Sequence, residues 1–504
     1  MLETQYNIVR ERLSPIRTPV FVGALGFLIS FAASWVPSLW RDEAATAYVA
    51  SHSIAGVLHT AGQIDGVFGL YYLMMHGWLS IVGTDPLTLR FLSAIAVGVG
   101  AAAVVAAGNR LNMPGAGISA GLVFAILPRM TAMGIEARSY AMCAAMIAIL
   151  GWLMLVLLEN PRSATAVLYF GVGTAAVYFH LYAVLVVGTM MLAGLWLGRT
   201  GRARATLVLA SAGIFAATVP LLILARGQAA AQISWINTSP SEQLLEAAVE
   251  QYFPFKTVVR FISIDQEWVR VVATCLSAVA WILVFALVAR RRSRFRRPLI
   301  FALPTVILPT AAVLSYSIFA SPSYTPKYLV ATVPAFSILL ACGLHILLRR
   351  WLKVTVAFVL VGLVIPIYVM QRQPYAKFLA DDYSFIAQTI KKNASEGDAI
   401  VFDEGPGDPV DSGRNAMAGY PQDFTRVTDI AKVRKGAETY TPWSPQLPFS
   451  NVQTSVATFS RVWLITTDQK IADPGADGVR LEHLGFHETT RINGPTHDVL
   501  LWTR

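Results

Sequence analysis

The chain has 504 residues, of which 55% are hydrophobic and only 14% are charged, and its mean hydropathy is +0.54. Soluble globular proteins carry roughly 25% charged residues, so the composition excludes that class, together with disordered, collagen-like and coiled-coil chains. The three cysteines (Cys143, Cys275 and Cys342) lie in apolar runs, and an odd number cannot form a closed disulfide framework. We therefore expect a polytopic α-helical membrane protein.

The apolar runs predict about eleven transmembrane helices, because a run of about 20 apolar residues crosses the hydrocarbon core. The runs lie at residues 20–39, 88–108, 113–129, 139–158, 164–180, 181–198, 205–225, 270–289, 299–319, 328–348 and 353–371. The first run does not read as a cleaved signal peptide, since no small-residue cleavage site follows it before Trp40.

Residues 66–83 are also apolar, but they contain His76 and four glycines. Counting them as a further span would place the arginine-rich loops outside. We therefore expect residues 44–83 to form interfacial or re-entrant helices on the outer face, where Tyr and Trp are favoured. A second large outer loop, residues 226–269, is predicted to contain amphipathic helices.

The composition changes after residue 372. Residues 1–372 hold 27 Lys and Arg against 13 Asp and Glu, whereas residues 373–504 hold 13 against 17. We predict a transmembrane domain over 1–372, with outer loops at 40–87, 130–138, 226–269 and 320–327, and a small α/β domain over 373–504. In the second domain we expect a helix at 381–392 and strands at 399–402, 462–466 and 499–502.

The loops predict the orientation. If residues 1–19 are cytoplasmic, the inner segments hold 17 basic and three acidic residues, and residues 290–297 alone contain six arginines. This asymmetry follows the positive-inside rule, so the basic total does not indicate nucleic-acid binding. We expect a multi-pass protein of the inner (plasma) membrane with a cytoplasmic N-terminus and an extracytoplasmic C-terminal domain.

The segment Trp40-Arg41-Asp42-Glu43 follows the first predicted span. Two adjacent carboxylates at a membrane surface are costly unless they are hydrated or used. The alternative is an ordinary polar boundary in which Arg41 neutralises one acid.

Further polar segments emerge on the same predicted face, and each has a simpler explanation as an interfacial anchor, a surface ion pair or a snorkelling lysine. They contain Asp65, Tyr71, Tyr72 and His76; Glu136, Arg138 and Tyr140; His180 and Tyr182; and Tyr324, Lys327 and Tyr328.

The order of these segments resembles the GT-C superfamily of integral-membrane glycosyltransferases. The closest resemblance is to its protein O-mannosyltransferase-like and aminoarabinose transferase-like branches, including the actinobacterial mannosyltransferases. The resemblance implies that Asp42 activates the acceptor hydroxyl, with Glu43 as its neighbour in the catalytic pair. It places Arg138, Lys327, Tyr140 and Tyr328 at the donor phosphate. Possible substrate contacts are Arg41, Asp65, Tyr71, Tyr72, His76, Glu136, His180, Tyr182 and Tyr324.

Chemistry explains why a single base suffices. A hydroxyl that attacks an anomeric carbon loses its proton as the bond forms, so a carboxylate within reach serves as general base. A phosphate leaving group needs no strong acid, unlike the leaving group in glycoside hydrolysis. The expected outcome is inversion at the anomeric carbon.

The resemblance further implies a polyprenyl-phosphate sugar donor, with mannose favoured, and a glycan, glycolipid or protein acceptor at the bilayer surface. Metal use stays open: Asp42 and Glu43 suit Mg²⁺ or Mn²⁺ if a divalent cation is used, whereas the Arg and Lys side chains can neutralise a monophosphate alone. Two alternatives stay open: transfer of arabinofuranose or another pentose, and a transporter or flippase of lipid-linked glycans. A transporter would place paired charges within the bilayer, whereas the predicted spans lack acidic residues at mid-depth.

Overall fold

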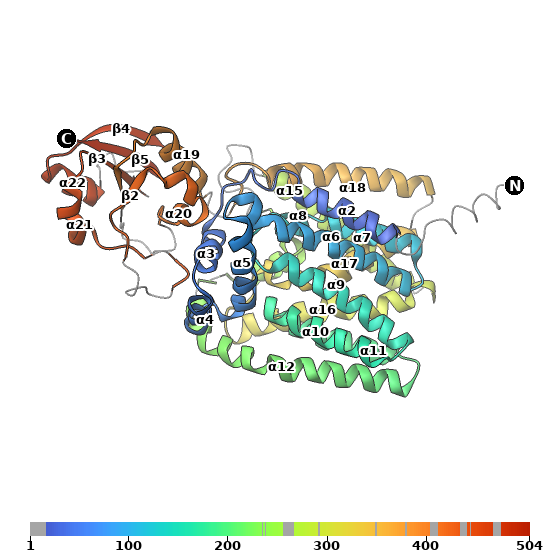
Figure 1. Ribbon diagram of the computed structural model, residues 1–504. Helices are drawn as coiled ribbons and strands as arrows, with labels where there is room; N and C mark the ends of the chain where they lie inside the picture. Colours follow the sequence, from blue (N-terminus) through green and yellow to red (C-terminus); the bar gives the residue numbers. More distant parts are fainter. Residues whose placement is uncertain are drawn as a thin grey trace.

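The structure is a computed structural model that describes residues 17–233, 235–236, 238–255, 267–290, 293–347, 350–377, 381–403, 412–433, 441–443, 445–466 and 475–504. It comprises a large helical bundle with a small α/β domain at one end (Figure 1). This arrangement confirms the predicted fold class.

In chain order, the bundle contains α2 (Arg17–Phe31), α6 (Pro86–Arg110), α7 (Pro114–Ile126), α8 (Pro128–Met133), α9 (Tyr140–Glu159), α10 (Ser163–Phe179), α11 (Ala183–Leu197), α12 (Gly201–Ile233), α15 (Glu267–Arg290), η3 (Ser293–Phe295), α16 (Arg296–Phe319), η4 (Pro326–Thr332), α17 (Val333–Leu347) and α18 (Arg350–Met370). Within the described residues, six segments are at least 18 residues long and apolar enough to cross a membrane, and six others form shorter apolar helices. Each of the predicted spans overlaps one of these helices, and the remaining shorter apolar helix covers Gly66–Val82. The chain is a multi-pass membrane protein.

Small residues let the helices of the bundle approach closely. A Cβ added to Gly23 of α2 would lie 2.9 Å from the carbonyl oxygen of Gly98 in α6, and one added to Gly108 would lie 2.5 Å from Cα of Gly117 in α7. Interfaces of this kind are typical of membrane helices, because lipid supplies little hydrophobic drive for their association. The close contact at Gly23 packs α2 tightly against α6, which carries Arg90.

The chain between α2 and α6 forms α3 (Arg41–Ala50), α4 (Ile54–Gln63), η1 (Gly66–Phe68) and α5 (Gly69–Val82). Figure 1 shows α3 and α5 lying across the end of the bundle, between the spans and the α/β domain. The 14 residues of α5 extend about 21 Å at 1.5 Å per residue, less than the hydrocarbon thickness. The same end carries α13 (Pro240–Leu245) and the π-helical turn η2 (Glu246–Glu250), where Ser239 and Glu242 form a capping box.

The C-terminal domain contains α19 (Tyr383–Asn393), β1 (Asp398–Phe402), α20 (Asn415–Gly419), η7 (Pro421–Phe424), β2 (Val427–Asp429), α21 (Phe449–Val456), β3 (Arg461–Thr466), α22 (Gly475–His483), β4 (His487–Asn493) and β5 (Asp498–Thr503). The strands form one sheet in the order β2-β1-β3-β5-β4. Strand β1 is parallel to β2 and β3, whereas β5 is antiparallel to β3 and β4. The predicted helix and three predicted strands correspond to α19, β1, β3 and β5.

Hydrophobic residues cover both faces of this sheet. Ile386 and Ile390 of α19 pack with Ile400 and Trp463 on one face. Phe449 of α21 and Leu481 of α22 belong to the cluster on the other face. The first of these faces includes Ala44 of α3, so the core of the domain continues into the helix that carries the acidic pair.

Candidate active site

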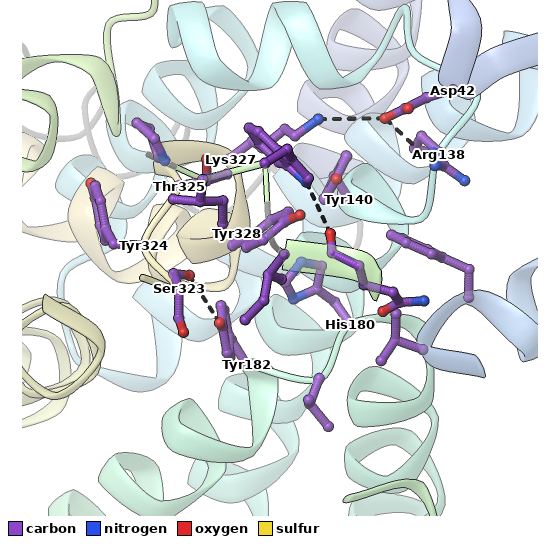
Figure 2. A pocket seen from close by; sticks show the side chains of 18 of the residues that line it. Asp42, Arg138, Tyr140, His180, Tyr182, Ser323, Tyr324, Thr325, Lys327 and Tyr328 are labelled. Carbon is purple, nitrogen blue, oxygen red and sulfur yellow. Dashed lines mark hydrogen bonds and ion pairs between the residues drawn. The ribbon is translucent and has the colours of Figure 1, made fainter. Parts of the chain in front are cut away.

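One cavity of about 1110 Å³ gathers side chains from every segment that the sequence singled out. Its lining includes Trp40, Arg41 and Asp42; Asp65; Glu136, Arg138 and Tyr140; His180 and Tyr182; and Tyr324, Lys327 and Tyr328. Figure 2 shows Asp42, Arg138 and Lys327 on one side of this cavity and the aromatic residues beneath them.

Asp42 lies in the first turn of α3 and faces two cations. Its Oδ2 is 3.5 Å from Nη2 of Arg138 and 3.5 Å from Nζ of Lys327 (Figure 2). Burial disfavours the charged carboxylate, but Arg138, Lys327 and Arg41 outweigh that effect and hold the pKa of Asp42 below its ordinary value. Asp42 is therefore ionised at neutral pH, and 19% of its side chain is exposed.

Lys327 is the second residue of η4 and lies against two aromatic rings. Its Nζ is 4.8 Å from the centroid of Trp40 and 5.5 Å from that of Tyr140. Cation–π contacts of this kind hold an ammonium group without neutralising it. Lys327 is therefore oriented toward Asp42 while part of its charge stays available to an anion.

Arg138 precedes α9 and is almost fully buried. Its Nη1 donates a hydrogen bond of 2.9 Å to the hydroxyl of Tyr72, and its guanidinium lies 4.4 Å above the ring of Phe68. Its Nε has no hydrogen-bond partner among the described residues. A buried guanidinium with a donor left over is suited to an anionic ligand.

Glu43 does not line the cavity. Its two carboxylate oxygens accept hydrogen bonds of 2.7 Å from Nε and 2.5 Å from Nη2 of Arg90, and the amide of Ala137 donates another, of 2.8 Å. Both side chains of the Glu43–Arg90 pair are fully buried. Burial opposes the charge of Glu43, yet Arg90 and Lys377 keep its pKa below the ordinary value. The expected catalytic pair is thus divided, because successive residues of a helix point in different directions.

Asp65 is held in a left-handed backbone conformation (φ 63°) between α4 and η1. It accepts hydrogen bonds of 2.7 Å from the hydroxyl of Tyr72 and 2.9 Å from Nε2 of Gln232. Burial raises the pKa of Asp65, although Arg138 and Tyr72 oppose the shift. The chain Asp65–Tyr72–Arg138 links α5 to the cation beside Asp42.

Glu136 lies in the cavity wall with one carboxylate oxygen, Oε1, that has no hydrogen-bond partner among the described residues. Its other oxygen is 3.9 Å from Nζ of Lys377, which donates a 2.7 Å hydrogen bond to the carbonyl of Ile135. Burial raises the pKa of Glu136 and lowers that of Lys377. The free oxygen is a candidate acceptor for a substrate hydroxyl.

Aromatic side chains form the floor of the cavity. The ring of His180 lies 5.4–5.8 Å from those of Tyr140, Tyr328 and Tyr182. Burial, reinforced by Lys327, lowers the pKa of His180 to about 3, so its imidazole is neutral. The hydroxyl of Tyr182 donates a hydrogen bond to the carbonyl of Ser323 (Figure 2). The hydroxyl of Tyr324 donates one to Oε1 of Gln251.

Tyr71, Tyr72 and His76 are not among the lining residues. Tyr71 is buried and packs against Phe179, whereas Tyr72 reaches the cavity indirectly through Asp65 and Arg138. His76 lies 2.9 Å from the carbonyl of Ala50, which joins α5 to the end of α3. These expected substrate contacts occupy supporting positions.

Another wall of the cavity is apolar. It is formed by α11, α12 and α16 and includes Val184, Leu185, Leu222, Ala225, Ile233 and Val313. Leu222 in this wall is 38% exposed. The cavity therefore combines fixed cations with a hydrocarbon-like side.

Among the described residues, no group of three or more His, Cys, Asp or Glu side chains has the arrangement of a metal site. The suggested metal pair is separated, because both oxygens of Glu43 are hydrogen-bonded to Arg90. The residues therefore do not fit the joint Asp42–Glu43 cation site that the sequence suggested.

The fold matches that of ArnT from Cupriavidus metallidurans over nearly the whole of both chains. The structure of ArnT from Cupriavidus metallidurans in the apo state matches with a TM-score of 0.55 and 12% identity, covering 96% of this chain and 97% of that chain. The same protein bound to undecaprenyl phosphate matches with a TM-score of 0.54, 11% identity and the same coverage. The Archaeoglobus fulgidus oligosaccharyltransferase complex with Zn and sulfate has a TM-score of 0.45 and 11% identity, covering 88% of this chain and 67% of that chain. No protein-family model matches the sequence, and no curated protein matches it significantly.

Sequence reasoning missed several residues that build the site: Phe68, Arg90, Gln232 and Lys377. Arg90 carried a usable signal, since an arginine two residues inside a predicted span must find a buried partner. Lys377 and Gln232 carried none, because their partners are distant in the sequence.

Proposed function

We propose that the protein is an inverting glycosyltransferase that moves a sugar from a polyprenyl-phosphate donor to an acceptor hydroxyl group on the extracytoplasmic face of the membrane. The observation that carries this proposal is the placement of Asp42, Arg138 and Lys327 in one cavity that also has an apolar wall. A carboxylate base, two phosphate-binding cations and a hydrocarbon-compatible surface are what such a reaction needs.

The proposed reaction forms one bond and breaks one. The acceptor oxygen attacks the anomeric carbon, the bond from that carbon to the phosphate oxygen breaks, and Asp42 takes the acceptor proton. Negative charge grows on the leaving phosphate, where Arg138 and Lys327 stabilise it more strongly than in the ground state. Attack opposite the phosphate inverts the anomeric configuration.

Donor binding would also activate the base. Two of the three cations that hold the pKa of Asp42 down, Arg138 and Lys327, are the groups that bind phosphate in this proposal. Their contacts with Asp42 are 3.5 Å long, so they are looser than ideal ion-pair hydrogen bonds. When the phosphate shares these charges, the carboxylate becomes more basic at the moment when it must accept a proton.

The remaining residues receive supporting roles. Glu43 positions the start of α3 through Arg90, while Asp65 and Tyr72 orient Arg138. The unpaired oxygen of Glu136 accepts a hydrogen bond from a substrate hydroxyl. Tyr140 and Tyr328, with Arg41, Tyr182, Tyr324 and neutral His180, shape the part of the cavity that holds the sugar and phosphate.

For the donor, the apolar wall and the similarity to a fold that is known with undecaprenyl phosphate support a polyprenyl carrier. For the sugar, mannose is our first choice and arabinofuranose the second. Because nucleotide sugars are cytosolic, a site on the extracytoplasmic face requires a lipid-linked donor. The acceptor class is a glycan, glycolipid or protein. Asp42 as the base and Arg138 and Lys327 as the phosphate-binding cations are sufficient for the reaction without a metal ion.

The test is Asp42→Asn, which keeps the shape of the side chain but cannot accept the proton. Purified protein in detergent would be assayed with polyprenyl-phosphate mannose and, in parallel, polyprenyl-phosphate arabinofuranose, using extracted envelope glycans and glycolipids as acceptors. We expect transfer to fall by about 10²–10⁴-fold, with retained binding of undecaprenyl phosphate.

The matched control is Glu159→Gln, which alters an exposed ion pair with Arg110 instead. It should transfer at the wild-type rate. Wild-type transfer by a folded Asp42→Asn variant would refute the catalytic role. Wild-type protein that transfers neither sugar in detergent, but moves lipid-linked glycans across vesicles, would favour a flippase.

A further inference from the structure

The C-terminal domain grips the short segment that leads into α3. Three backbone amides of this segment donate hydrogen bonds to the domain: that of Ser38 to the carbonyl of Pro374 (2.6 Å), that of Leu39 to the hydroxyl of Tyr420 (3.0 Å) and that of Arg41 to Oδ2 of Asp381 (2.8 Å). In return, Oγ of Ser38 accepts a hydrogen bond from the backbone amide of Ser384 (3.1 Å). Residues 38–41 are thus bonded over their length to residues more than 300 positions away.

Asp381 supplies what α3 itself lacks. The residue before α3, Trp40, makes no side-chain capping hydrogen bond, and the first amides of a helix have no partner inside the helix. The carboxylate of Asp381 accepts from the first of these amides, that of Arg41. A negative charge at this end is also favoured by the helix dipole. Asp42 is the next residue, so its position depends on this cap.

The cap is anchored in the interior of the domain. The neighbouring residue, Asp382, accepts hydrogen bonds from the amides of Thr496 and His497 and lies 2.6 Å from Nδ1 of His497. Thr496 and His497 belong to the connection between β4 and β5. Asp381 therefore stands next to a fixed point of the sheet.

Close packing reinforces the hydrogen bonds. A Cβ added to Gly419, at the end of α20, would lie 2.4 Å from Cδ1 of Leu39, and Leu39 is fully buried. From the other side, Nη1 of Arg90 donates to the carbonyls of Ser34 and Pro37. The segment is therefore held between the bundle and the C-terminal domain.

We infer that the C-terminal domain is a positioning element for the general base, and that Asp381 and Tyr420 are the residues through which it fixes the start of α3 and hence Asp42. This inference rests on the proposed function for the role of Asp42, but the docking itself can be measured without any sugar transfer.

The first experiment is hydrogen–deuterium exchange on the full-length protein in detergent. Asp381→Ala should speed exchange of the Arg41 amide, and Tyr420→Phe should speed exchange of the Leu39 amide, because each amide loses its acceptor. Asp381→Asn keeps an acceptor oxygen and should restore protection. Asp423→Ala is the matched control, since Asp423 pairs with Lys391 within the same domain. Unchanged exchange in residues 38–44 of both variants would overturn the inference, whatever the activity.

The second experiment separates positioning from binding. With polyprenyl-phosphate mannose or arabinofuranose, whichever the wild type uses, Asp381→Ala should lower kcat by about 10- to 100-fold, as expected for a misplaced catalytic group. Binding of undecaprenyl phosphate should be unchanged, and Asp381→Asn should recover most of kcat. If Asp42→Asn is inactive while Asp381→Ala has wild-type kcat, the positioning inference fails alone. If Asp42→Asn is fully active, the proposed function fails, and the exchange data still decide whether the domain fixes the segment.

Discussion

At the scale of single residues, two neighbouring acids have opposite environments. Asp42 is partly exposed in the cavity and has loose contacts with two cations, whereas Glu43 is enclosed by Arg90 and the amide of Ala137. A general base must be able to exchange its hydrogen-bond partners during the reaction, whereas a buried structural carboxylate must keep them. This difference separates their roles better than their shared charge does.

Replacing either cation should weaken the handling of phosphate. We expect Arg138→Ala and Lys327→Ala each to cost about 1.5–3 kcal/mol, the value of a charge-assisted hydrogen bond, or roughly 10- to 150-fold in kcat/KM. Much of the loss should be in kcat, because charge on the phosphate grows as its bond to the sugar breaks. Steady-state kinetics check this, with Arg270→Ala on the exposed side of α15 as control. Unaltered kinetics in both variants would leave Arg138 as a buried structural residue and Lys327 as a snorkelling lysine.

Glu43 should behave as a stability residue. Removing one partner from a buried ion pair leaves an uncompensated charge and typically costs about 3–5 kcal/mol. We expect Glu43→Leu to lower thermal stability strongly and the double variant Glu43→Leu with Arg90→Met to recover much of it. Thermal denaturation in detergent checks this. A Glu43→Leu protein with wild-type stability but no sugar transfer would instead indicate that Glu43 has a catalytic role.

At the scale of elements, the turn between α10 and α11 buries a neutral histidine among tyrosines. The folded-state pKa of His180 is about 3, below the unfolded value of 6.5. Above pH 6.5, His180 is neutral in both states and does not change the free energy of unfolding. As the pH falls from 6.5 toward 3, only the unfolded chain gains the proton, so the folded state loses stability.

His180→Phe should remove this dependence and keep an aromatic ring. Between pH 7 and pH 5, the wild type should lose about 2 kcal/mol more stability than the variant. Apparent Tm values at the two pH values, measured for both proteins, check the difference. Parallel pH dependence in the two proteins would show that His180 is protonated within the folded cavity.

The sequence predicted elements far better than their contacts. Apolar runs locate the spans because crossing a bilayer imposes one length and one composition, and β1, β3 and β5 follow from short apolar β-rich runs. Strands β2 and β4 were not predicted, because β2 has only three residues and β4 is mostly exposed and therefore lacks an apolar run. The cavity segments were recognisable from their order along the chain. The sequence could not predict that Asp42 and Glu43 point in different directions, or which residues Arg90 and Asp381 contact. Each of these features depends on residues that are brought together only by folding.

At the scale of the whole molecule, charge and geometry can be tested against each other. The C-terminal domain lies at the same end of the bundle as α3 and α5 (Figure 1). The turn between α11 and α12 lies toward the other end; it contains Arg199, and Arg202 follows at the start of α12. The positive-inside rule then predicts that the arginine-rich end is cytoplasmic and that the cavity opens on the extracytoplasmic side.

Cysteine labelling decides this orientation. In a variant without the three native cysteines, Glu482→Cys on the exposed side of α22 should react with an impermeant thiol reagent in intact cells. Thr200→Cys, in the exposed turn before α12, should react only after the membrane is opened. Reagent access to both sites in opened cells is the internal control. The reverse pattern would place Asp42 on the cytoplasmic side, where nucleotide sugars are available, and would remove the reason for a lipid-linked donor.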